Sequence, residues 1–130
     1  MAARLLVSVV DDDESVRGSL PDLLRELGFR AESFASAEEF LASESLDQTR
    51  VLVLDIAMPG MNGSALQQEL RAQRRAIPIV FITAHADETV RQQLFKAGAV
   101  DVLFKPFTES ALLVAMTAAV RANGSNGRMK

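Results

Sequence analysis

The chain has 130 residues, of which 48% are apolar and 24% charged, so it has the size and composition of one compact domain with one core. Its formal net charge is −3, and acidic and basic residues alternate along the chain, which excludes the basic footprint of a nucleic-acid-binding surface. There is no cysteine, no secretory signal layout, and no apolar run near the roughly 20 residues of a membrane span. We therefore expect a cytoplasmic protein without membrane association.

Five short apolar segments predict the strands of a sheet that is buried on both faces. They are rich in Val, Ile and Leu and cover residues 5–10, 30–34, 51–54, 79–82 and 100–104, the second being the weakest. Apolar residues with helical spacing lie between them, for example Val16, Leu20, Leu23, Leu24 and Leu27, then Val90 and Leu94, then Leu112, Ala115, Met116 and Ala119. Strand and helix thus alternate five times.

Capping residues stand at the expected helix ends: Ser36 with Glu39, Asp87 and Thr108 at starts, and Gly28 and Gly98 after ends. Pro21 falls inside the first predicted helix, where it removes a backbone hydrogen bond, so we expect a kink or a late helix start. Residues 123–130 are polar and lack apolar periodicity. We expect one domain over residues 1–122 and a linker-like or disordered tail over 123–130.

Five strands joined by helices require right-handed crossovers and a mostly parallel sheet with helices on both faces, which is a doubly wound α/β domain. In such sheets the binding crevice lies outside the carboxyl ends of the strands. The first predicted strand is followed by Asp11, Asp12, Asp13 and Glu14. The third is followed by Asp55, the fourth by Thr83, and the fifth by Lys105 and Pro106. All four groups should meet at one edge.

Carboxylates gathered at that edge repel one another by about 3 kcal/mol per pair at roughly 5 Å and an effective dielectric constant near 20. Carboxylate oxygens without histidine or cysteine suit a hard divalent cation, and magnesium fits a site shared with a phosphate. Asp55 is then a candidate nucleophile that forms an aspartyl phosphate, with Lys105 as the neutralising cation and Thr83 as a hydroxyl donor.

Each of these features alone has a structural alternative. The acidic run could be a solvated turn that includes a helix N-cap, and Asp55 could be another turn residue. Thr83 could be a helix cap, and Lys105 could be an exposed surface side chain. The joint placement of all of them at the carboxyl ends of four strands favours the phosphoryl site.

Four segments resemble the receiver domains of bacterial two-component response regulators: residues 9–17, 53–63, 81–85 and 97–107. The resemblance extends to about Val120, and Thr83, His85 and Asp87 are most similar to the FixJ branch, whose receivers precede a LuxR-type helix-turn-helix. It implies a flavodoxin-like (CheY-like) (βα)5 domain with a five-stranded parallel sheet in the order 2-1-3-4-5, and a cis bond before Pro106.

The resemblance also implies residue roles. Asp55 is the implied phosphorylation site, and Mg²⁺ (or Mn²⁺) is held by Asp11, Asp12, Asp55 and the backbone carbonyl of Ala57. Thr83 and Ala84 follow the phosphoryl group on activation, and Lys105 pairs with it.

Three positions are candidate modulators of this chemistry. Ala57, two residues after Asp55, has no side chain that could orient or exclude a hydrolytic water. His85 is the only histidine; it could tune hydrolysis of the phosphoryl group, but we favour a solvent-facing residue without a catalytic role. Val102 stands where many receivers carry a rotating Tyr or Phe, so that aromatic switch is in doubt, and Phe104 cannot be assumed to replace it.

The implied function is that of a receiver that takes a phosphoryl group from a sensor histidine kinase and switches a face made by the fourth helix, fifth strand and fifth helix. Such a receiver is not a classical enzyme, although it catalyses its own phosphotransfer and autodephosphorylation. We expect homodimerisation through that face and a C-terminal DNA-binding domain beyond this chain. The alternative is a stand-alone receiver that acts through protein–protein interaction.

Two other classes fit less well. Phosphatases with an aspartate nucleophile pair it with a second aspartate two residues later, and here that position is Ala57. A flavodoxin-like FMN carrier would share the fold, but the chain has no Trp or Tyr to stack on the flavin ring.

Overall fold

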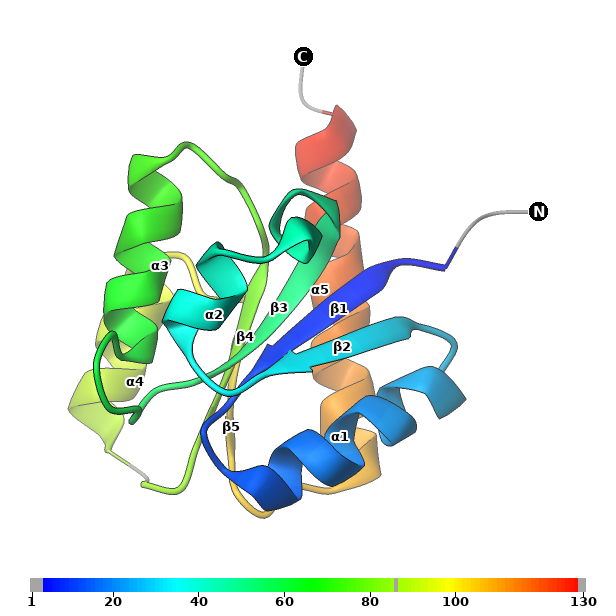
Figure 1. The fold of residues 1–130 in the computed structure, drawn as a ribbon, viewed down its shortest axis with the longest axis horizontal. Helices are drawn as coiled ribbons and strands as arrows, with labels where there is room; N and C mark the ends of the chain where they lie inside the picture. The colour runs from blue at the N-terminus through cyan, green and yellow to red at the C-terminus, as the bar shows by residue number, and fades with distance from the viewer. Residues whose placement is uncertain (1–3, 86, 129–130) are drawn as a thin grey trace.

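The computed structural model of the chain describes residues 4–85 and 87–128, with side chains described up to residue 123. Its five strands form one parallel sheet in the order β2-β1-β3-β4-β5, which confirms the fold predicted above (Figure 1). The strands are β1 (Leu6–Val10), β2 (Arg30–Phe34), β3 (Thr49–Asp55), β4 (Ile79–Thr83) and β5 (Asp101–Phe104). Each lies within two residues of its predicted bounds at either end.

Helices follow the strands, one after each strand. They are α1 (Glu14–Glu26), α2 (Ala37–Leu41), α3 (Gly63–Ala72), α4 (Glu88–Lys96) and α5 (Glu109–Arg128), with a 3₁₀ turn, η1 (Glu44–Gln48), before β3. Helices α1 and α5 cover one face of the sheet, and α2, α3 and α4 cover the other (Figure 1). This is the doubly wound, three-layer arrangement.

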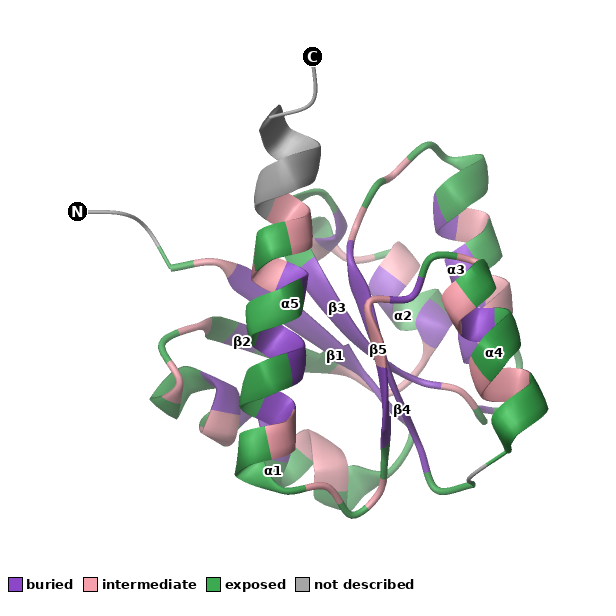
Figure 2. Ribbon diagram, turned by 180° about the vertical axis from the view of Figure 1, so that it is seen from behind, coloured by how far each residue is buried: buried purple, intermediate pink, exposed green. Residues whose placement is uncertain are grey.

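The sheet divides the apolar interior into two layers. Buried side chains of β1, β3 and β4 alternate between them, so that Val51 and Val53 face α1 and α5 while Leu52 and Leu54 face α2, α3 and α4. Figure 2 shows buried residues along the strands and on the inner sides of the helices, with exposed residues on the outer helix surfaces. The single core expected from chain length is therefore two layers that share one sheet.

The predicted helix caps form hydrogen bonds. Ser36 Oγ accepts from Glu39 N at 3.0 Å, Asp87 Oδ1 from Val90 N at 3.2 Å, and Thr108 Oγ1 from Ala111 N at 3.0 Å. Gly28 and Gly98 have φ values of 103° and 107°, which is the left-handed conformation predicted for them.

Helix α1 differs from expectation at its start. It begins at Glu14, so a late start, one of the two outcomes expected from Pro21, is wrong; Pro21 lies inside the helix and is buried, and the kink stays a prediction. An acidic N-cap explains the early start, because Asp13 Oδ1 accepts from Ser15 N at 2.9 Å and satisfies a free donor of the first turn.

Helix α5 continues beyond residue 122 as helical backbone to Arg128. Residues 123–128 thus extend the helix, where the sequence had suggested an irregular linker, and residues 129–130 of the predicted tail lie outside the described residues. The domain boundary at residue 122 stays a prediction. Within residues 4–85 and 87–128, no helix is both long and apolar enough to cross a membrane.

Adjacent leucines of α5 provide a matched test of the packing. Leu112 is fully buried against the sheet, whereas the side chain of Leu113 is 47% exposed. We expect Leu112→Ala to lower the free energy of unfolding by about 2–5 kcal/mol, and Leu113→Ala by about 0.5 kcal/mol or less. Urea denaturation followed by circular dichroism measures both, and equal losses would contradict this packing of α5.

Candidate functional site

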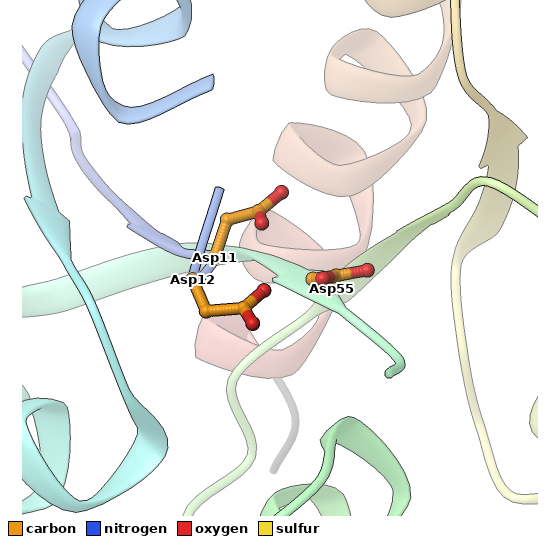
Figure 3. A group of neighbouring side chains, drawn as sticks. All are labelled: Asp11, Asp12 and Asp55. Carbon is orange, nitrogen blue, oxygen red and sulfur yellow. The ribbon is translucent and has the colours of Figure 1, made fainter. Parts of the chain in front are cut away.

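The carboxyl ends of β1 and β3 bring three aspartates together. The two strands are parallel neighbours in which Val10 is paired with Leu54, so the residues that follow, Asp11 and Asp55, are side by side. Asp12 is the next residue along the chain. One oxygen atom from each of the three side chains lies within 4.8 Å of the other two. Figure 3 shows the three side chains gathered at the strand ends. The prediction that acidic residues from two strand ends would converge is confirmed.

Asp11 is fully buried and has contacts on both carboxylate oxygens. Its Oδ1 accepts from Asp13 N at 2.8 Å, and its Oδ2 forms an ion pair with Lys105 Nζ at 2.8 Å, without the geometry of a directed hydrogen bond. Arg17 Nη1 donates to the Asp11 carbonyl at 3.0 Å. The turn after β1 is therefore fixed by its own side chain and by two cations.

Lys105 connects the far strand to this cluster. It directly follows β5, its backbone N–H donates to the Thr83 carbonyl at 2.7 Å, and its peptide bond to Pro106 is cis, as the resemblance implied. Its Nζ lies 3.8 Å from Asp55 Oδ1. Burial acts to lower the pKa of Lys105, but the contact with Asp11 and the negative charges of Asp55 and Asp11 act to raise it and have the larger effect. The net result is a raised pKa, so the ammonium group stays charged.

Asp55 is the most perturbed carboxyl of the site. Burial raises its pKa, the charge of Asp11 raises it further, and Lys105 opposes both, with a resulting pKa of about 7. Only 7% of its side chain is exposed. A carboxylate at this position needs more positive charge than one lysine supplies.

The residues present fit a divalent cation. Three carboxylates and one ammonium carry a summed charge of −2 when all are ionised, with all of the negative charge on oxygen ligands. A dication of the magnesium type would neutralise this charge, and Mg²⁺ accepts a site with few carboxylates. The backbone carbonyl of Ala57 as a further ligand stays a prediction.

The loop after β3 approaches Asp55 closely. Gly63 N donates to Ile56 O at 2.9 Å, and a Cβ atom on Gly63 would lie 2.5 Å from the Asp55 carbonyl oxygen. Any side chain here would push α3 away from the strand end. Glycine therefore allows α3 to start directly beside the candidate nucleophile.

The predicted switch residues lie on the other side of Asp55. Thr83 is buried, and its Oγ1 accepts from His85 N at 3.1 Å, so the hydroxyl is held by the loop after β4. Ala84 and His85 are exposed, and Val102 is buried. A cavity of about 150 Å³ borders Thr83 and is lined also by Ile56, Ala57, His85, Asp87, Val90, Arg91, Val102 and Phe104.

Sequence reasoning missed some contributors to this site. Arg17 lies in the recognised first segment without an assigned role, although its spacing of six residues from Asp11 suits a helix side chain that reaches back over its N-terminus. Glu38, whose carboxylate accepts from Met61 N at 3.0 Å, gave no local signal because the two residues are 23 positions apart. The roles assigned to Asp11, Asp12, Asp55, Thr83 and Lys105 stay predictions, since contacts alone do not test them.

Comparisons with known proteins agree on one family. The family described as "Response regulator receiver domain" matches residues 7–117. Nodulation protein W of Bradyrhizobium diazoefficiens is 44% identical over 118 residues, which cover 91% of this chain and 52% of that protein. Transcriptional regulatory protein FixJ of Azorhizobium caulinodans is 36% identical over 131 aligned positions, which cover 100% of this chain and 62% of that protein. The structure of response regulator StyR is 47% identical, with a TM-score of 0.88 over 97% of this chain and 64% of that one.

The chain belongs to the receiver-domain family of response regulators. Members of this family work in two-component phosphorelays, where phosphorylation of the receiver controls an output. The chain spans about half the length of curated relatives such as nodulation protein W.

The raised pKa of Asp55 has a consequence for stability. The folded, metal-free protein holds a proton on Asp55 that the unfolded chain releases at lower pH, so stability falls as pH rises from about 4 to 7. We expect Asp55→Asn, which cannot titrate, to raise the free energy of unfolding more at about pH 8 than at about pH 5. Urea denaturation in the presence of a metal chelator measures the free energy of unfolding, with Asp22→Asn on the exposed side of α1 as the control. An equal gain in stability at both pH values would argue against the raised pKa of Asp55.

Proposed function

We propose that Asp55 accepts a phosphoryl group from the phosphohistidine of a sensor kinase, and that this event switches the face formed by α4, β5 and α5. The observation that carries the proposal is the convergence of Asp55 with Asp11, Asp12 and Lys105 at one sheet edge. A receiver supplied by such a kinase works in the cytoplasm.

In the proposed step an Asp55 carboxylate oxygen attacks phosphorus. A phosphorus–oxygen bond forms, the phosphorus–nitrogen bond of the donor breaks, and its electron pair stays on the imidazole nitrogen. Mg²⁺ bound by Asp11 and Asp12 would lower the pKa of Asp55 and neutralise charge on the phosphoryl oxygens. Lys105 supplies the second cation, since its Nζ already lies 3.8 Å from Asp55 Oδ1. The domain thereby catalyses its own phosphorylation. Attack of water on the phosphorus of the aspartyl phosphate would give autodephosphorylation.

The donor has an approach beside this site. A groove of about 680 Å³ runs next to Lys105 and is lined mainly by apolar side chains of α1 and of the segment before α5, including Val16, Leu20, Leu23, Pro106 and Phe107. A helix of the kinase that carries the phosphohistidine would bury its apolar face here. Because Lys105 belongs to the groove wall, the donor would arrive within reach of Asp55.

The proposed readout begins at Thr83. If its hydroxyl moves to a phosphoryl oxygen, it leaves His85 N and changes the wall of the cavity shared with Val90, Val102 and Phe104. Phe104 is directly paired with Thr83 in the sheet and is 37% exposed, so it carries the change to the surface. A switch from about 1:99 to 99:1 requires roughly 5.5 kcal/mol of differential stabilisation.

A homodimer is the readout that the surface supports best. The exposed large apolar side chains of the described residues are Phe104, Leu113 and Val114, all on β5 or α5. The output proposed for the whole protein is transcriptional, through a C-terminal DNA-binding domain, because a relative is named as a transcriptional regulatory protein and the chain covers only part of it. A stand-alone receiver is the alternative.

Phosphorylation is tested by mass. We expect acetyl phosphate with Mg²⁺ to add one phosphoryl group to the wild-type chain, and none to Asp55→Asn, because the nucleophilic oxygen is lost. Asp22→Asn should be modified like the wild type. Intact-protein mass spectrometry decides; an adduct that survives Asp55→Asn would sink the assignment.

Dimerisation is tested by size. With Mg²⁺ and beryllofluoride as a phosphoryl mimic, the wild-type mass in light scattering should rise toward that of a dimer. Val114→Asp should keep the protein monomeric, because it places a charge in the apolar contact, while Gln68→Asp on exposed α3 should dimerise normally. Normal dimerisation of Val114→Asp would exclude this face.

A further inference from the structure

A carboxylate outside the acidic cluster is bound to the loop that follows Asp55. Glu38, on the exposed side of α2, accepts a hydrogen bond from Met61 N through Oε2 at 3.0 Å. Met61 lies between Asp55 and the start of α3, in the loop that also carries Ala57. The contact therefore joins α2 to the backbone segment beside the candidate nucleophile.

Gly60 shows how closely the carboxylate approaches this loop. A Cβ atom on Gly60 would lie 2.9 Å from Glu38 Oε2, and its φ of 74° is the left-handed conformation that favours glycine. The hydrogen bond from Met61 lowers the pKa of Glu38, so the side chain is a charged acceptor at neutral pH.

The helix that carries Glu38 is firmly anchored. Ala37 and Phe40 on its inner side are fully buried, and the Phe40 ring contacts Phe34 of β2 with centroids 5.5 Å apart. The neighbouring Glu39 turns the other way and accepts a hydrogen bond from the backbone N–H of Ala35, the residue before the N-cap Ser36, at 3.4 Å. Glu38 is therefore free to bind the loop, and the helix that carries it is held in place.

Two tethers then define the loop between β3 and α3. One is internal, from Gly63 N to Ile56 O at 2.9 Å, and the other is external, from Met61 N to Glu38. Ala57, whose carbonyl is the predicted backbone ligand of the metal, lies between the internal tether's ends. Release of the external tether would leave this carbonyl on a loop held from one side only.

We infer that Glu38 is a positioning residue that holds the β3–α3 loop in the conformation required for divalent-cation binding. This rests on the proposed function, because the cation site is part of it. Groups that orient metal ligands from outside the ligand set commonly change metal affinity by about 10- to 100-fold when they are lost.

Three variants separate positioning from charge. Glu38→Ala removes the acceptor, Glu38→Gln keeps an oxygen that can accept from Met61 N, and Glu39→Gln removes the same charge from the same helix without touching the loop. We expect the Mg²⁺ dissociation constant, measured by calorimetry, to rise on the order of tenfold in Glu38→Ala and less in Glu38→Gln. It should stay at the wild-type value in Glu39→Gln.

A second readout uses the metal-free protein. Hydrogen exchange of the Met61 amide, followed by NMR, should accelerate in Glu38→Ala and not in Glu39→Gln, while the circular dichroism spectrum stays unchanged because Glu38 is exposed. If Glu38→Ala binds Mg²⁺ as tightly as the wild type, or if Glu39→Gln loses as much Mg²⁺ affinity as Glu38→Ala, the inference is overturned while the proposed function stands. A wild-type chain that binds no Mg²⁺ would overturn the proposed function and this inference with it.

Discussion

The repulsion between Asp11 and Asp55 is the interaction on which the site depends. Both carboxyl groups are buried at adjacent strand ends, and the sheet register leaves them no freedom to separate. Lys105 offsets part of this repulsion from the other side, and the remaining imbalance is expressed in the pKa of Asp55. The fold thus leaves uncompensated negative charge at the place where a phosphoryl group and its cation would bind, and a cation there would be stabilised.

Residues that follow strands could be predicted from the sequence, because parallel pairing brings all carboxyl ends to one edge. Asp11, Asp55, Thr83 and Lys105 were found in this way. The acidic run divides by role only in the structure: Asp11 and Asp12 join the cluster, whereas Asp13 caps α1. Local spacing suits both roles equally, so the choice of Asp11 and Asp12 as metal ligands came from the family resemblance and not from the spacing.

The misses have physical reasons. A late start of α1 was one of the two outcomes expected from Pro21; the helix begins at Glu14 because Asp13 caps it there, and Pro21 lies buried within the helix. The hydrogen bond from Met61 N to Glu38 depends on how the β3–α3 loop packs against helix α2, which no periodicity in the sequence predicts. Residues 123–128 have helical backbone despite their low intrinsic helix propensity, with two glycines in the segment, and the tail that begins at residue 123 stays a prediction.

The apolar groove next to Lys105 and the cavity next to Thr83 open on opposite faces of the sheet. The groove belongs to the layer of α1 and α5, and the cavity to the layer of α2, α3 and α4. The groove and the cavity share no lining residue, so a substitution in the wall of one leaves the wall of the other unchanged.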